Sequence, residues 1–176
     1  MLTDRLLCPD HRFRDVYEID PEWLRDLGVR AVLIDIDNTL VTYDDPEPTA
    51  PVLGWLGKLG DAGISVAFIS NNERERVERF NSMLGFVAEW KAGKPLTGKS
   101  RRAMNALGVS PRETAVIGDQ IFTDIRLGKK LGAGVTILVE PIKDKKTLFF
   151  RFKRLLEVPI KRRYEKIRGK KHGKVQ

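Results

Sequence analysis

Residues 31–40 read AVLIDIDNTL, an aliphatic run that ends in two carboxylates, an amide and a hydroxyl. The aliphatic residues do not alternate with polar ones, which is typical of a strand buried on both faces of a parallel sheet. Asp35 and Asp37 are two residues apart, so in an extended chain their side chains point to the same side. Two carboxylates this close repel, and the pKa of one rises unless a cation or a hydrogen-bond donor lies between them. The stretch therefore predicts a site that binds a metal or a phosphate, or that moves a proton.

Apolar runs and helical periodicities alternate along the rest of the chain. Strands are expected at 64–69, 86–90, 114–117 and 135–139, helices at about 21–27, 50–62, 73–84, 96–107 and 124–131, and a short extended piece at 16–19. Such alternation implies a parallel sheet with helices on both faces. The predicted fold class is α/β, a Rossmann-like three-layer sandwich.

The composition of the chain is that of a globular protein. It has 176 residues, of which 41% are hydrophobic and 32% charged. We find no run of ~20 apolar residues that could span a membrane, and the first ten residues, MLTDRLLCPD, lack a basic and then apolar signal pattern. The single cysteine, Cys8, excludes an internal disulfide. We therefore expect a cytoplasmic protein.

The net charge of +8 is unevenly distributed along the chain. Residues 141–176 contain 14 Lys and Arg against 3 Asp and Glu, whereas residues 1–140 contain 18 against 21. The expected division is therefore a mildly acidic core, residues 1–140, and a basic tail, residues 141–176. A charge asymmetry of this kind indicates a polyanionic partner such as a membrane surface or a nucleic acid, or else a solvated tail that maintains solubility.

Polar side chains follow three of the predicted strands at the points where these strands end. Asp35 and Asp37 follow the first, Ser70 the second and Asp119 the third, and Lys94 comes from a loop. In a parallel sheet the carboxyl ends of the strands share one edge, where ligands bind. Carboxylates, a hydroxyl and an ammonium suit phosphoryl transfer assisted by Mg²⁺, which prefers oxygen ligands. An aspartate can also be the nucleophile.

At four motifs the chain resembles the haloacid dehalogenase-like (HAD) phosphatase superfamily. The motifs are DIDNT at 35–39, SNN at 70–72, KP at 94–95 and GDQIFTD at 118–124. They occur in the family's order within residues 32–139, and their forms are similar to subclass IIIA. Within that subclass the chain resembles the YqeG group, which is similar to phosphatases that act on phosphatidylglycerophosphate. The resemblance implies a HAD-like core and a Mg²⁺-dependent phosphomonoester hydrolase.

The same resemblance implies roles for four aspartates. Asp35 would be the nucleophile that forms an aspartyl-phosphate, and its carboxylate would also contact Mg²⁺. Asp37 would be the general acid and then the general base, and its backbone carbonyl would be a second metal ligand. Asp119 would complete the metal site. Asp124 would belong to this site directly, or would act by holding Asp119 or a metal-bound water.

The resemblance also implies which residues contact the phosphate. Ser70 would hydrogen-bond a phosphoryl oxygen, and Lys94 would offset charge on the phosphate and on Asp35. Lys91 lies in the same loop and is the alternative catalytic lysine, although the proline after Lys94 favours Lys94. Asn71 and Asn38 are the predicted substrate contacts, and Asn38 also fits a role in fixing its loop.

Each motif has a simpler interpretation when it is taken alone. Residues 37–39 could form a helix cap and turn, Ser70 could be a turn residue, and Asp124 could cap the following helix. A turn at 37–39 leaves the carboxylate of Asp35 unexplained. The joint occurrence of the motifs therefore favours chemistry.

The spacing of the motifs leaves no room for a cap domain. Only 32 residues separate Asp37 from Ser70, and 23 separate Ser70 from Lys94. An open site favours a substrate whose bulk lies outside it, such as a lipid head group at a surface, a protein or a nucleic acid end.

The tail offers a way to recognise such a substrate. Its apolar residues fall on one helical face beside basic ones, at Leu148, Phe149, Phe152, Leu155 and Leu156. A basic amphipathic helix can make a peripheral contact with an anionic membrane, or it can be a terminal helix that covers the sheet. We therefore favour phosphatidylglycerophosphate as the substrate. The alternative is an RNA- or ribosome-associated binding protein with a vestigial phosphatase site.

Overall fold

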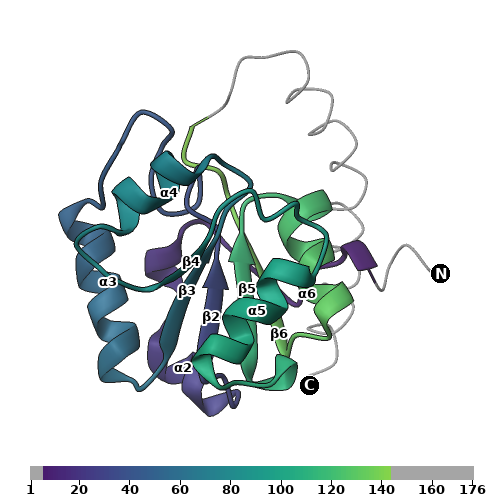
Figure 1. The fold of residues 1–176 in the computed structure, drawn as a ribbon. Coiled ribbons are helices and arrows are strands. Elements are labelled where there is room, and N and C mark those ends of the chain that lie inside the picture. The colour runs from purple at the N-terminus through teal and green to yellow at the C-terminus, as the bar shows by residue number, and fades with distance from the viewer. Residues whose placement is uncertain (1–5, 144–176) are drawn as a thin grey trace.

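The computed structural model describes residues 6–143, and its central feature is a six-stranded parallel sheet (Figure 1). The order across the sheet is β1-β6-β5-β2-β3-β4, and every neighbouring pair is parallel. The strands are β1 His11–Phe13, β2 Ala31–Ile34, β3 Ser65–Ile69, β4 Val87–Glu89, β5 Thr114–Gly118 and β6 Val135–Val139. The predicted α/β fold with a parallel sheet is confirmed.

Helices cover both faces of this sheet. They are α2 Pro21–Asp26, α3 Ala50–Asp61, α4 Arg74–Asn81, α5 Gly98–Leu107 and α6 Arg126–Leu131. On one face, apolar residues of α2, α3 and α4 pack on Val32 and Ile34 of β2. On the other face, residues of α5 and α6 pack on Leu33 of the same strand. Because neighbouring residues of β2 point to opposite faces and all are buried, this strand reads as a continuous aliphatic run.

One local prediction was wrong, and one strand was missed. Residues 16–19 were expected to be extended, but Val16–Glu18 is a 3₁₀ turn, capped by the Asp15 carboxylate that accepts the N–H groups of Tyr17 and Glu18. Strand β1, His11–Phe13, was not predicted. It has only three residues, and its partners in β6 lie more than a hundred positions away. A strand this short carries almost no periodic signal, so pairing with a distant strand decides its conformation.

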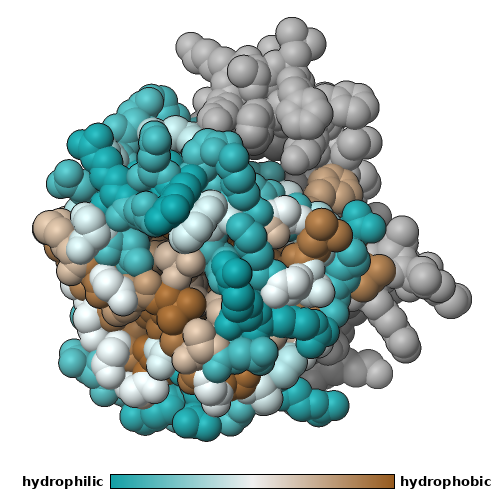
Figure 2. Space-filling model, in the orientation of Figure 1, coloured by the Kyte–Doolittle hydropathy of each residue, from teal (hydrophilic) through white to brown (hydrophobic). Residues whose placement is uncertain are grey.

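The carboxyl ends of the strands lie at the end of the molecule where α4 begins (Figure 1). Figure 2 shows that this end is strongly hydrophilic, whereas hydrophobic side chains reach the surface lower on the same face. Between Asp37 and Ser70 the only regular helix is α3, and between Ser70 and Lys94 there are only α4 and β4. The described chain therefore has no cap domain over this end, as the motif spacing predicted.

None of the helices within residues 6–143 has the length and apolar character needed to cross a membrane. The predicted amphipathic helix and nearly all of the basic tail fall at 144–176, outside the described residues.

Candidate active site

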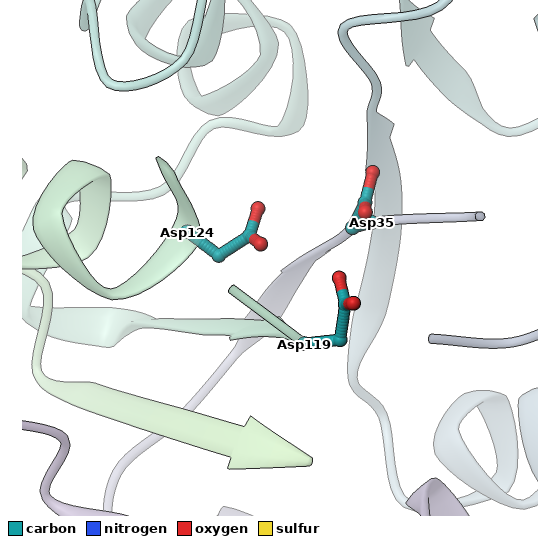
Figure 3. Close-up of side chains that lie close together, drawn as sticks. All are labelled: Asp35, Asp119 and Asp124. Carbon is teal, nitrogen blue, oxygen red and sulfur yellow. The ribbon is translucent and has the colours of Figure 1, made fainter. Parts of the chain in front are cut away.

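Three buried aspartates meet at the carboxyl ends of the two central strands (Figure 3). Asp35 directly follows β2, Asp119 directly follows β5, and Asp124 lies in a π-helical turn, Ile121–Ile125. Strands β2 and β5 are neighbours, and the Asp35 N–H donates to the Ile117 carbonyl at 3.1 Å. One carboxylate oxygen from each aspartate lies within 4.8 Å of the other two. The sheet therefore brings together residues almost ninety positions apart.

Asp124 reaches this cluster because Gly118 has no side chain. A Cβ on Gly118 would lie 2.3 Å from Asp124 Cγ, so only glycine leaves room for the carboxylate. The π-helical turn aims Asp124 back over the strand, and its Oδ2 accepts from the Gln120 N–H and the Thr123 hydroxyl, both at 3.1 Å. The sequence predicted a helix from 124; the wider turn before α6 is a kind of bulge often found at functional sites.

Lys94 is the lysine that enters the cluster. Its Nζ is 2.7 Å from Asp35 Oδ1 and 2.7 Å from Asp124 Oδ1, and its side chain is only 3% exposed. Lys91 is instead paired with Glu73 on the surface, where 60% of the Lys91 side chain is exposed. The geometry therefore favours Lys94 over Lys91 as the lysine of the candidate site.

The cluster is electrostatically strained without a further cation. Burial, and then repulsion from Asp124 and Asp37, raise the pKa of the Asp35 carboxyl to about 7, although Lys94 partly opposes the rise. Burial disfavours the charged form of Lys94, but Asp124 and Asp35 outweigh it and raise the pKa of the ammonium. Three carboxylates and one ammonium leave two negative charges. These residues fit a divalent cation in both charge and ligand type.

Asp37 lies beside this cluster but has different partners. Its Oδ1 accepts from Arg76 Nε at 3.1 Å and from Arg76 Nη2 at 2.9 Å, and its Oδ2 accepts from Asn72 Nδ2 at 3.1 Å. The sequence predicted that Asp35 and Asp37 repel each other. Burial and Asp124 have larger effects on the pKa of Asp35 than Asp37 does, and the carboxylate of Asp37 is itself paired with Arg76.

The SNN motif fixes the geometry after β3. The Ser70 Oγ accepts the Asn72 N–H at 3.0 Å, which leaves the hydroxyl proton of Ser70 to be donated to a ligand. The Asn71 amide oxygen accepts the Lys94 N–H at 2.7 Å, and its amide nitrogen is 3.4 Å from the Lys94 carbonyl. Asn71 thus holds the main chain of Lys94. Its predicted contact with substrate remains a prediction.

Asn38 forms the tight turn after Asp37. It has φ +66°, its N–H donates to the Val41 carbonyl at 2.7 Å, and its carbonyl accepts from the Ile142 N–H at 3.2 Å. The side-chain oxygens of Asn38 and Thr39 are buried without a hydrogen-bond partner among the described residues. The main-chain groups of Asn38 thus fix the loop, and the predicted contact of Asn38 with substrate remains a prediction.

Two residues near the carboxylates were missed from the sequence. Arg76 lies six positions after Ser70 in a helix whose charges look like those of any solvated surface. Tyr43 lies in the loop after residues 35–39; burial and the charges of Asp35, Asp119 and Asp37 raise the pKa of its hydroxyl. Neither residue belongs to a recognised motif, so only the folded arrangement identifies them.

Comparisons with known proteins agree with this geometry. A HAD-hydrolase-like family model matches residues 91–146. The Bacillus subtilis (strain 168) protein named "Probable phosphatase YqeG" is 33% identical over 156 residues, which cover 89% of this chain and 90% of that protein.

Solved structures of other proteins share the fold, and two of them illustrate the similarity. A Listeria monocytogenes serotype 4b protein of uncharacterised function superposes with a TM-score of 0.54 at 18% identity, covering 68% of this chain and 85% of that one. The cobalt-bound deoxy-D-mannose-octulosonate 8-phosphate phosphatase of Haemophilus influenzae gives 0.50 at 20% identity, with 62% and 68% covered. At these identities the likeness concerns the fold. Because a third of its residues match YqeG along nearly the whole length of both chains, the chain belongs to the HAD-like phosphatases, in the YqeG group.

Proposed function

We propose that this phosphatase is a Mg²⁺-dependent phosphomonoester hydrolase that works through an aspartyl-phosphate on Asp35. The observation that carries the proposal is the buried set of three carboxylates, two of which pair with Lys94, where Lys94 Nζ lies 2.7 Å from Asp35 Oδ1. A nucleophilic carboxylate needs to be desolvated and at the same time kept anionic. Burial supplies the first requirement, and Lys94 together with a divalent cation would supply the second.

Each residue has a defined part in the two steps. A carboxylate oxygen of Asp35 attacks phosphorus, the bond from phosphorus to the alcohol oxygen breaks, and Asp37 gives its proton to that oxygen. Water then attacks the phosphorus of the aspartyl-phosphate, Asp37 takes a proton from the water, and inorganic phosphate leaves. Ser70 donates to a phosphoryl oxygen, and Lys94 offsets charge on the phosphate and on Asp35.

The metal would be held by the carboxylates of Asp35, Asp119 and Asp124 and by the main-chain carbonyl of Asp37. When bound, Mg²⁺ orients the phosphate and neutralises charge that the approaching carboxylate would otherwise meet. Asn71 and Asn38 are assigned to the substrate side of the site. The contact of Asn71 with the main chain of Lys94 gives it a second role in placing the lysine.

Phosphatidylglycerophosphate is the favoured substrate, and the course of the chain after β6 supports it. The Ile142 N–H donates to the Asn38 carbonyl, and Lys143 Nζ lies 2.6 Å from Asp44 Oδ2 in the loop that follows the tight turn at Asn38. The chain therefore leaves the core, residues 1–140, beside the candidate site. A basic tail, residues 141–176, that begins there could bring the site to an anionic membrane surface from the cytoplasmic side.

The decisive experiment measures inorganic phosphate release by the full chain. Wild type and Asp35→Asn are compared on phosphatidylglycerophosphate in vesicles and on soluble phosphomonoesters, with Mg²⁺ and with EDTA. We expect release by the wild type in Mg²⁺ only and a loss of at least about 10³-fold in Asp35→Asn, since the nucleophile is removed. Asp61→Asn, an exposed aspartate at the end of α3, is the matched control and should retain activity.

Failure to release phosphate from any lipid or soluble ester, together with tight, salt-sensitive RNA binding, would support the binding-protein alternative. The buried carboxylate cluster argues against that outcome. Three buried acids have no evident packing function, and retaining them in a vestigial site would cost stability.

A further inference from the structure

Arg76 reaches from helix α4 into the edge of the candidate site. Its Nε and Nη2 both donate to Asp37 Oδ1, at 3.1 and 2.9 Å. The Arg76 side chain is 15% exposed and that of Asp37 is 6% exposed. Two N–H groups from one rigid guanidinium on one oxygen fix the direction as well as the position of that carboxylate.

The same guanidinium also binds residues 42–46, the loop that follows the tight turn at Asn38. Arg76 Nη1 donates to the Pro46 carbonyl at 3.0 Å, and Nη2 lies 3.5 Å from the Thr42 carbonyl. This loop carries Tyr43. Burial and the charges of the nearby carboxylates raise the pKa of its hydroxyl. Arg76 thus joins three parts of the chain: α4, the loop 42–46 and Asp37.

The other oxygen of Asp37 is also held. Asn72 Nδ2 donates to Oδ2 at 3.1 Å, and the main chain of Asn72 is in turn fixed by Ser70 Oγ and by the Lys91 N–H. Both carboxylate oxygens are therefore held by residues that follow β3. The rotamer of Asp37 is determined from outside its own turn.

The hydrogen bonds of Arg76 show which role it can have. A guanidinium has five N–H groups, and four of them are directed at Asp37, Thr42 and Pro46. Little donor capacity is left for a phosphate. A role in binding substrate is therefore less consistent with the geometry than a role in holding Asp37.

We propose that Arg76 is a positioning residue that fixes the carboxylate of Asp37, and with it the loop 42–46, for proton transfer to and from substrate. The inference rests on the proposed function, in which Asp37 is the acid and base. A misplacement of about 1 Å in a group that transfers a proton can cost about 10²-fold in rate. Arg76 acts through Asp37 and does not itself contact the reacting atoms.

The test compares Arg76→Ala, Arg76→Lys and wild type as full chains, with glycerol 1-phosphate as the probe substrate and Mg²⁺ present. We expect kcat to fall about 10²-fold in Arg76→Ala. KM should change less than about threefold, because the substitution does not alter the binding of substrate in the ground state. Added millimolar guanidinium should restore part of the kcat of Arg76→Ala. A purely structural loss would not respond in this way.

Arg79→Ala is the matched control. Arg79 lies one turn further along α4, its side chain is 62% exposed, and it pairs with Glu47 only at 3.8 Å. The same loss of charge from the same helix should leave kcat within about twofold of the wild type, because an exposed pair at this distance contributes little.

Several outcomes would overturn the inference and leave the proposed function standing. In each of them the wild type is active and Asp35→Asn is inactive. Arg76→Ala then shows either an unchanged kcat or a loss that appears mainly as a raised KM. If Arg76→Ala does not fold, Arg76→Lys decides: an ammonium cannot reach Asp37 and Pro46 together, so a kcat within about twofold of the wild type would refute the positioning role. A wild type that releases phosphate from neither phosphatidylglycerophosphate nor any soluble ester would instead refute the proposed function itself.

Discussion

The charge state of Asp35 is governed by three neighbours and by its removal from water. Asp124 and Asp37 raise the pKa of Asp35, Lys94 lowers it, and burial has the largest effect, so that the carboxyl titrates at about 7 in the protein without a cation. The ordinary value is 3.8. The folded protein therefore binds the Asp35 proton more tightly than the unfolded chain does, and deprotonation costs stability as the pH rises from about 4 through about 7.

Asp35→Asn should therefore stabilise the metal-free protein at high pH. In EDTA we expect its melting temperature to exceed that of the wild type at pH 8, with the difference shrinking toward pH 4, where the wild-type carboxyl is protonated in the folded state. Each kcal/mol gained in the free energy of unfolding raises the melting temperature by about 2–4 °C for a protein of this size. Differential scanning fluorimetry between pH 4 and 8 measures the effect, and a difference independent of pH would contradict it.

The close approach of Gly118 to Asp124 makes a second prediction at the scale of one residue. Gly118→Ala places a methyl group within 2.3 Å of Asp124 Cγ, so the carboxylate must move away from Lys94 and from the other two acids. We expect the stabilisation of the protein by Mg²⁺ to be largely lost and kcat to fall at least about 10²-fold. Thermal unfolding with increasing Mg²⁺, followed by kinetics, would measure both.

Gly57→Ala is the control for that substitution. Gly57 lies in the interior of α3, and a methyl group added there would have nothing within 4 Å, so alanine should raise stability by about 0.5–1 kcal/mol. If Gly118→Ala behaved like Gly57→Ala, the proposed steric role of Gly118 would be wrong.

At the scale of elements, short turns decide where the central strands begin. The 3₁₀ turn Pro111–Glu113 precedes β5 and has a capping box, in which Glu113 accepts from the Ser110 N–H at 2.9 Å and from its hydroxyl at 2.6 Å. The Glu113 carbonyl accepts from the Arg30 N–H at 2.7 Å, just before β2. This turn thus aligns the starts of the two strands that carry Asp35 and Asp119 at their far ends.

Glu113 should contribute to stability only above its own titration range. Hydrogen bonds from Ser110, and then the Arg30 side chain, lower the pKa of Glu113 to about 2 from an ordinary 4.5. Because the folded pKa is the lower one, the contribution is present above about pH 4.5 and is lost as the pH falls toward 2. An NMR titration of the Glu113 carboxyl carbon should give the low value in the wild type and a higher one in Ser110→Ala. An unshifted titration in the wild type would contradict the capping box.

At the scale of the whole molecule, charge is separated between the core and the tail. The core carries the acidic cluster at an end without a cap, and residues 141–143, the first of the basic tail, lie beside that end. An acidic site would by itself repel an anionic surface. The basic residues of the tail could offset that repulsion over roughly one Debye length, about 8–10 Å at physiological salt.

Neutralising part of the tail should therefore weaken binding to anionic vesicles. We compare two full-length variants, each with three basic residues changed to glutamine. The tail variant changes Lys161, Arg162 and Arg163. The control, the core variant, changes Lys58, Arg101 and Lys130, which lie on the surface of the core. At roughly 1 kcal/mol per charge near an anionic surface, the loss of three charges should make the tail variant bind vesicles containing phosphatidylglycerol about 10²-fold more weakly.

The core variant should bind the same vesicles like the wild type. Both variants should retain kcat on glycerol 1-phosphate, because the substituted residues lie outside the proposed catalytic set. Sedimentation with vesicles at low and high salt measures the binding. Equal losses in the two variants would show that net charge, and not the tail, governs the contact.

Much of the fold was predictable because its signals are local. The aliphatic run before Asp35, the glycines that end helices and the polar residues after strands depend on neighbours within a few positions, so the α/β alternation and the edge of the candidate site could be read from the sequence. Strand β1 could not, because three residues carry no period and β6 lies far along the chain.

The sequence by itself determined that Asp35, Ser70 and Asp119 gather at the carboxyl end of the sheet, since the ends of parallel strands share one edge. Only the tertiary structure decided their pairing. Lys94 rather than Lys91 meets Asp35 because the chain after β4 turns inward at Lys94 and leaves Lys91 at the surface beside Glu73. Asp37 meets Arg76, 39 positions away, because α4 begins beside the turn after β2. Such pairings depend on packing between distant elements, and no local pattern encodes them.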